Sequence, residues 1–150
     1  MTMSLQEISD RMEIGDLIVD YAMAIDGSNW DALDDLFTSD AHIDYTATGG
    51  IAGNLAEIKA FLPEGLKYFS SHQHLTTTSK VVIDGDTATG RTICHNPMTI
   101  TAEDGSTQTM TVGLWYIDRF VRTSDGWRFA ERSEELSYMS NLPKGFDGPS

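Results

Sequence analysis

The chain has 150 residues, of which 40% are hydrophobic and 22% charged, the size and composition of one globular domain. Its 23 acidic residues outnumber its 10 basic residues, the formal net charge is −13, and no cluster of Lys or Arg interrupts this excess. The charge argues against nucleic acid and anionic membranes as partners and favours a neutral or weakly charged small molecule.

The first half of the chain has the pattern of helices. Ser4 and Glu7 form a capping-box pattern, and apolar residues then recur at helical spacing until Gly27 ends the helix. Ser28 is placed to cap a second helix that carries Trp30 on its apolar face. We therefore expect two consecutive helices, joined by a short break.

A short strand at 41–46 follows and leads into a turn at Gly49 and Gly50. A third helix is expected after its cap, Asn54, and Pro63 helps to end it. The amino-acid composition then changes to stretches rich in Thr, Val and Ile, separated by turns that contain Gly.

These stretches predict four long antiparallel strands, at about 72–83, 86–101, 107–122 and 127–136. Helices followed by strands are typical of an α+β fold. We expect a single domain over 1–150, with a core of about 5–136 and a C-terminal tail of 137–150.

Cys94 is the only cysteine, so no internal disulfide can form, and we expect a small core residue in a reduced protein. The sequence has neither the pattern of a secretory signal nor an apolar run long enough for a membrane span. These features predict a cytoplasmic protein.

Strand alternation sorts the polar residues that could face an internal pocket. His72 and His74 share one face of the first long strand, and His95 lies on the second. The apolar side of the third long strand comprises Met110, Val112, Leu114, Tyr116 and Phe120. Each polar candidate also has a purely structural interpretation, because a lone His is often a hydrogen-bonded core residue and Asp26 could simply close a helix junction.

Several segments together resemble the nuclear transport factor 2-like superfamily, and its SnoaL-like, scytalone dehydratase-like branch in particular. The segments are Tyr21 to Asp26, Trp30-Asp31, Ala41 to Tyr45, Gln73-His74, Asp84-Gly85-Asp86 and Gly126 to Ala130. The resemblance covers about residues 5–136. It implies a cone-shaped, cystatin-like roll, in which N-terminal helices pack on a strongly curved, mostly antiparallel sheet around a deep hydrophobic pocket.

The resemblance also implies a site. In dehydratases of this branch, an aspartate that ends the first helix hydrogen-bonds a proton-transferring histidine on the first long strand, and Asp26 and His74 match these positions. Tyr45 matches a strand tyrosine of those enzymes, and Tyr21 matches a catalytic tyrosine of bile-acid dehydratases. His95 is the counterpart of a second catalytic histidine, with an offset of a few residues.

The sequence departs from the scytalone dehydratase pattern at Ile25, where those enzymes have a tyrosine, so scytalone itself is not expected as the substrate. A later polar pair of those enzymes falls near Leu114 and Tyr116, and only the tyrosine is polar here. The substrate-binding residues that we expect are Tyr116, Leu114, Val112, Trp30 and Phe61.

These residue types suit elimination without a cofactor. Asp26 would fix the tautomer of His74 and leave the other ring nitrogen free to take a proton next to a carbonyl. Tyr21 and Tyr45 would donate hydrogen bonds to the oxygen that gains charge. We therefore predict a lyase, similar to a dehydratase, that cleaves a carbon-oxygen or carbon-carbon bond in a neutral, largely apolar cyclic or aromatic molecule.

Other functions stay open. A ketosteroid-type isomerase would also use Tyr21, but its carboxylate base falls at Tyr45 here. A metal site could combine His72 and His74 with His95 or with the helix-end aspartate, yet an Asp–His pair accounts for His74 without metal, so we expect none. The same fold also hosts non-catalytic ligand-binding modules. By resemblance, we expect a homodimer or homotrimer.

Overall fold

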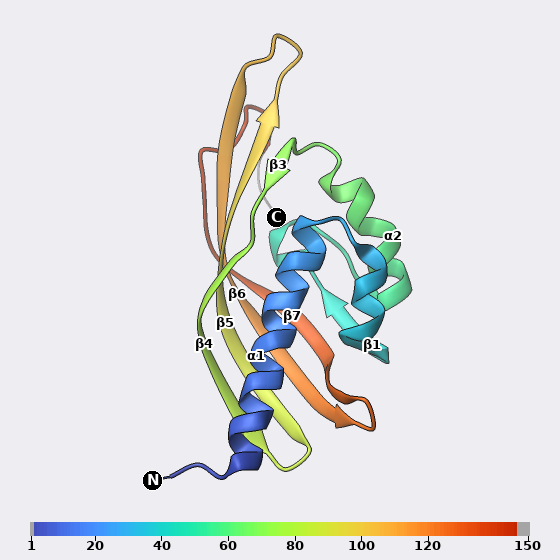
Figure 1. The fold of residues 1–150 in the computed structure, drawn as a ribbon. Coiled ribbons are helices and arrows are strands. Elements are labelled where there is room, and N and C mark those ends of the chain that lie inside the picture. Colours follow the sequence, from blue (N-terminus) through green and yellow to red (C-terminus); the bar gives the residue numbers. More distant parts are fainter. Residues whose placement is uncertain (1, 147–150) are drawn as a thin grey trace.

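The computed structural model describes residues 2–146 as a curled sheet with helices packed against one of its faces (Figure 1). The helices are α1 (Leu5–Asp26) and α2 (Leu55–Leu66), with 3-10 turns η1 (Trp30–Asp35) and η2 (Thr46–Thr48). The strands are β1 (Phe37–Asp44), β2 (Ala52–Asn54), β3 (Ser71–His72), β4 (Leu75–Asp84), β5 (Thr87–Thr101), β6 (Thr107–Thr123) and β7 (Gly126–Ser140). The predicted α+β roll is confirmed.

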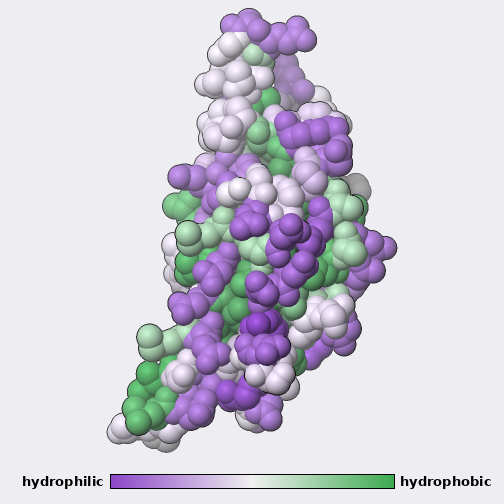
Figure 2. Space-filling model, turned by 45° about the vertical axis from the view of Figure 1, so that its right-hand side comes forward, coloured by the Kyte–Doolittle hydropathy of each residue, from purple (hydrophilic) through white to green (hydrophobic). Residues whose placement is uncertain are grey.

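The sheet has the strand order β2-β1-β7-β6-β5-β3, and β4 pairs with β5 beside β3. β1 runs parallel to β7, whereas the other pairs are antiparallel. The hairpin between β5 and β6 projects beyond the helices (Figure 1), and its tip is hydrophilic (Figure 2) because it carries Glu103 and Asp104. The helices therefore leave this end of the sheet uncovered (Figure 1).

Two of the three predicted helix caps, Ser4 and Asn54, are confirmed. The Ser4 side chain accepts a hydrogen bond from the backbone of Glu7 at the start of α1. At α2, Asn54 and Glu57 form a reciprocal capping box. These bonds satisfy amides that have no partner within the helix, which fixes the first turn.

Two helix predictions were wrong in detail. The second helix is only the turn η1, and Asn29 rather than Ser28 precedes it, because Ser28 adopts a left-handed φ of 52°. Pro63 lies inside α2, which continues to Leu66. At the other end of the chain, β7 runs to Ser140, past the predicted end at 136.

Cys94 lies in the core, as expected, and burial raises the pKa of its thiol to about 12. A thiol with this pKa stays protonated at neutral pH and behaves as a small apolar side chain. Within residues 2–146, no helix combines the length and the apolar character needed to cross a membrane.

A buried carboxylate, Asp10, fastens α1 to the sheet. Its Oδ1 accepts hydrogen bonds from Arg122 Nη1 at 2.6 Å and from the Trp127 indole at 3.0 Å, and its Oδ2 accepts one from Arg122 Nη2 at 2.9 Å. These bonds, that of Arg122 first, hold the pKa of Asp10 well below its usual range. Asp10 therefore stays ionised and fixes the angle of α1 on the sheet.

Replacing Asp10 with Asn should lower Tm by several degrees, because Arg122 loses its charged acceptor and the Trp127 indole loses part of its hydrogen bond. Thermal unfolding followed by circular dichroism measures this change. Asp16→Asn, on the exposed face of the same helix, is the matched control and should leave Tm unchanged. Equal Tm values for the two variants would contradict the fastening role.

Candidate active site

A cavity of about 390 Å³ lies between the helices and the inner face of the sheet. Its wall is largely apolar and includes Phe61, Val112 and Leu114, three of the residues expected to bind substrate. The polar side chains on the wall are Tyr21, Tyr45, Thr48, Tyr68, His74, Asn96, Tyr116 and Glu134. Few polar groups on an apolar wall are typical of small-molecule sites.

Trp30 does not line this cavity, and that expectation was wrong. It lies instead on a second hollow, together with Asp26, His72 and Lys67. The short turn η1 places it there, because the chain turns away from α1 at Ser28 instead of continuing as a helix over the cavity.

Asp26 is the last residue of α1, and its carboxylate holds His74 by two hydrogen bonds. Oδ1 lies 2.7 Å from His74 Nδ1, and Oδ2 accepts a bond of 2.9 Å from the His74 backbone N–H. The predicted Asp26–His74 contact is therefore present. We assign the ring proton to Nδ1, beside the carboxylate, which leaves Nε2 as a proton acceptor on the cavity side.

His74 lies in a break between β3 and β4 and not within one continuous strand. At this break the Gln73 backbone donates a hydrogen bond of 3.1 Å to the carbonyl of Pro97 on β5. The side chain of His74 is 8% exposed. The sequence predicted one continuous strand and not this break. The break turns His74 toward Asp26 at the end of α1.

His72 shares the same carboxylate. Its Nδ1 lies 3.0 Å from Asp26 Oδ1, and its ring meets that of His74 edge to face at 5.7 Å. Burial acts to raise the pKa of Asp26, but the hydrogen bonds from His74 and His72 outweigh it and lower this pKa to about 2. Asp26 is thus ionised at neutral pH. Possible ligand atoms of all three residues lie within 4.8 Å of one another, which makes this trio the place where a metal ion could be held.

Asn96 completes this end of the cavity, and the sequence reasoning missed it. Its Nδ2 lies 3.3 Å from His74 Nε2, and its side chain is buried. His95 was expected here instead and lies on the outer face, where its Nδ1 is 3.0 Å from the Tyr138 hydroxyl. Alternation along β5 gives the reason, because Cys94 and Asn96 point inward and the residue between them points outward.

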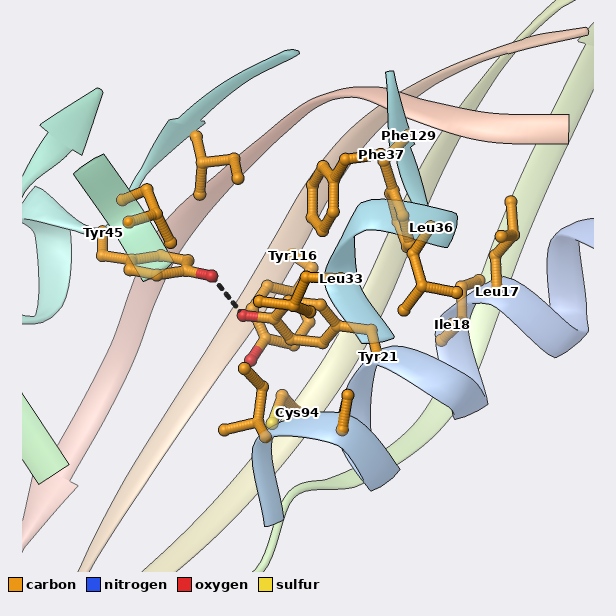
Figure 3. Packing of buried hydrophobic residues seen from close by; sticks show 14 of the residues in the cluster. Leu17, Ile18, Tyr21, Leu33, Leu36, Phe37, Tyr45, Cys94, Tyr116 and Phe129 are labelled. Atoms are coloured by element: carbon orange, nitrogen blue, oxygen red, sulfur yellow. Dashed lines mark hydrogen bonds between the residues drawn. The ribbon is translucent and has the colours of Figure 1, made fainter. Parts of the chain in front are cut away.

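Tyr21 from α1 and Tyr45 after β1 meet inside the cavity, where their hydroxyls form a hydrogen bond (Figure 3). Burial raises the pKa of Tyr21 to about 12 and that of Tyr45 well above its usual value. Both hydroxyls therefore keep their protons at neutral pH and can serve as hydrogen-bond donors. The ring of Tyr116 lies beside that of Tyr21, with centroids 5.6 Å apart.

A buried ion pair supports these tyrosines. Arg132 Nε and Nη2 each lie 2.8 Å from the carboxylate of Asp118, and both side chains are fully buried. The guanidinium carbon lies 4.2 Å from the centroid of Tyr21 and 3.9 Å from that of Tyr116. Burial acts to lower the pKa of Arg132, but Asp118 keeps it above its usual range, so a fixed positive charge lies behind the two rings.

Glu134 is a further carboxyl group on the cavity wall that the sequence reasoning missed. It extends from β7 and accepts a hydrogen bond from Thr48 Oγ1 to its Oε2. Burial raises its pKa from 4.5 to about 7. A substantial fraction of Glu134 is therefore uncharged at neutral pH.

This pKa makes stability depend on pH. The folded state favours the protonated carboxyl, so its stabilising contribution is complete below about pH 4.5 and is lost as the pH rises to about 7. We expect the free energy of unfolding to fall by about 2–3 kcal/mol more in the wild type than in Glu134→Gln across this range. Urea unfolding at each pH measures the difference. Glu135→Gln, on the exposed side of β7, should follow the wild type, and an identical pH dependence in all three proteins would contradict the assignment.

The chain is similar in sequence and in fold to several known proteins. Residues 6–133 match the family model of the SnoaL-like domain. An uncharacterized protein of Mycobacterium tuberculosis is 48% identical over 140 residues, which cover 93% of this chain and 94% of the relative. The crystal structure of the Kfla4162 protein from Kribbella flavida is 30% identical, with a TM-score of 0.81 over 90% of this chain and 95% of that chain. The LinA-type3 hexachlorocyclohexane dehydrochlorinase from Novosphingobium barchaimii shares the fold at 17% identity, with a TM-score of 0.79 over 93% and 94% of the two chains.

Proposed function

Since this chain belongs to the SnoaL-like domain family, we propose that it is a cofactor-independent lyase that removes water or another small group from a small molecule. The observation that carries this proposal is the pair of Asp26 and His74, 2.7 Å apart, at the wall of an otherwise apolar cavity. A histidine held in one tautomer by a carboxylate is suited to move a proton.

In the proposed reaction, the substrate displaces the Asn96 amide from His74 Nε2, and this nitrogen takes a proton from the carbon next to a carbonyl. The electron pair of that C–H bond forms an enolate, and its oxygen accepts a hydrogen bond from the Tyr21–Tyr45 pair. The electrons then return to form a carbon-carbon double bond as the bond to the leaving hydroxyl breaks. Protonated His74 gives its proton to that hydroxyl, so water leaves and the enzyme regains its first state.

The cavity favours a neutral cyclic or aromatic substrate. Its volume of about 390 Å³ suits a molecule of two or three rings, and aliphatic and aromatic side chains dominate the wall. The net charge of −13 disfavours polyanionic substrates. The dehydrochlorinase named among the structural relatives supports elimination as a reaction for this fold, because that enzyme also removes a group from a ring.

Isomerisation of an unsaturated ketone is the second candidate. The tyrosine pair favours it equally, because the same enolate forms in both reactions. The fate of the proton separates the two, since an isomerase returns it to another carbon and no group is lost.

A screen of hydroxylated steroids, polyketide-like aromatics and lignin-derived phenolics tests the proposal, with mass spectrometry to detect loss of water or of a small carbonyl fragment. We expect turnover in at least one class by the wild type and none by His74→Ala. A product of unchanged mass with a shifted double bond would support the isomerase. Tight binding without any turnover would contradict both and favour a binding module.

A further inference from the structure

The tyrosine end of the cavity is one hydrogen-bond donor short of a good oxyanion site. Tyr21 and Tyr45 bond to each other, so one of their two hydroxyl protons is already used and one is left for a ligand. An oxygen that gains a full negative charge in an apolar site is stabilised by several donors aimed at it. A second donor must therefore come from another residue on the wall.

Glu134 is placed to supply it. Its backbone lies opposite Tyr116 in the pairing of β6 with β7, so the two side chains share the inner face. Thr48 Oγ1 lies beside Glu134 Oε2 and 3.2 Å from the carbonyl oxygen of Tyr45, so the carboxyl lies near the backbone of this tyrosine. The charge of Glu134 also acts to raise the pKa of both Tyr21 and Tyr45. In residues 2–146 no group hydrogen-bonds the other carboxyl oxygen, Oε1, so this atom is available to a ligand.

We infer that Glu134, in its uncharged form, donates a hydrogen bond to the carbonyl or phenol oxygen of the substrate. The substrate would then be a cyclic ketone or phenol that lies with this oxygen at the tyrosine end and its reacting carbon at His74. This inference rests on the proposed function and orients the substrate for it. The pKa of about 7 supports it, because a large share of Glu134 carries the necessary proton at neutral pH.

The phenols and the thiol around Glu134 do not change charge with it. Those that face it are Asp44 at the end of β1, Thr48 and Tyr45 after β1, Tyr21 on α1, Cys94 on β5, Tyr116 on β6, and Arg132 with its partner Asp118. Burial, the largest influence, and Asp44 favour the protonated carboxyl, whereas the Thr48 hydrogen bond and Arg132 favour the carboxylate. The phenols and the thiol have a raised pKa and keep their protons near pH 7.

Binding of pentafluorophenolate, a stable mimic of an enolate, tests the inference without any turnover. Calorimetric titrations from about pH 7 to about pH 9 keep this acidic phenol ionised, so its own charge stays constant. We expect the affinity of the wild type to fall by about tenfold per pH unit above the pKa of Glu134, as the carboxylate forms and repels the anion. In Glu134→Gln, the amide donates at every pH, and the affinity should stay flat.

Three control variants make the outcome decisive. Glu135→Gln, whose side chain bonds Arg91 on the outer face, should behave like the wild type. Thr48→Val removes a hydrogen bond that favours the carboxylate, so the fall in affinity should move to higher pH even if Glu134→Gln folds poorly. His74→Gln removes the other titratable group near the probe and should keep the pH dependence.

A wild-type affinity that does not change with pH, the same fall in Glu134→Gln, or no binding at any pH would overturn the inference. A fall that disappears in His74→Gln would overturn it as well, because the titrating group would then be the histidine. None of these results depends on elimination. Failure of the proposed function would instead appear as an absence of turnover in the substrate screen, so the two failures can be told apart.

Discussion

Replacing His74 with Gln should lower kcat for elimination by a factor of about 10²–10⁴, the usual contribution of a general base. The glutamine amide can still bond to the Asp26 carboxylate, so the local structure is kept, but an amide cannot accept the carbon-bound proton in place of the imidazole. Single-turnover kinetics on a substrate from the screen measure the loss. His95→Gln is the matched control, because this histidine bonds Tyr138 on the outer face and should be dispensable.

Asp26 should affect kcat indirectly, by positioning His74. In Asp26→Asn, the amide can donate to Nδ1 and favour the wrong ring tautomer, for which a loss of up to about 10⁴ in kcat has precedent in other Asp–His pairs. KM should change little, because Asp26 lines the second hollow and not the main cavity. A large change in KM with kcat preserved would contradict this positioning role, and full activity of His74→Gln would contradict the mechanism.

Arg132→Met should lower the free energy of unfolding by about 3–5 kcal/mol, the cost of leaving a buried carboxylate without its partner. The affected carboxylate is Asp118, which has no exposed surface and bonds Arg132 through both oxygens. The rings of Tyr21 and Tyr116 also lose the cation that lies against them. Urea unfolding monitored by tryptophan fluorescence measures the change.

A double variant separates the charge from the packing. Combining Arg132→Met with Asp118→Leu removes both charges and should recover most of the lost stability. Arg119→Met, whose partner Glu131 is exposed, is the matched control and should have little effect. If Arg132→Met were as mild as Arg119→Met, the ion pair would not be needed to hold the tyrosines.

The starts of α1 and α2 and the end of α1 could be predicted because short-range signals mark them. Caps at Ser4 and Asn54 set the helix starts, and Gly27 fixes the end of α1. The partnership of Asp26 with His74 came from a resemblance in order and spacing, because no local signal joins residues so far apart. His72 was expected to share a face with His74, and the common carboxylate agrees with this.

The inward position of Arg132 and Glu134 could not be predicted from the sequence, because β7 contains one extra residue. Phe120 pairs with Phe129, but the next pair is Arg119 with Glu131, so Ala130 is inserted as a bulge. Simple alternation from Phe129 would place Arg132 and Glu134 on the outer face, and the bulge reverses this. A buried Arg and a buried Glu are also rare enough that their residue types predict exposure.

Exchange of carbon-bound protons tests the central claim most directly, because it reports proton abstraction whether or not a group leaves. A bicyclic ketone such as decalone, incubated with the protein in deuterium oxide, can be followed by NMR at the positions next to its carbonyl. We expect the wild type to speed deuterium incorporation and His74→Gln not to do so. Equal incorporation with the two proteins would contradict the assignment of His74 as the base.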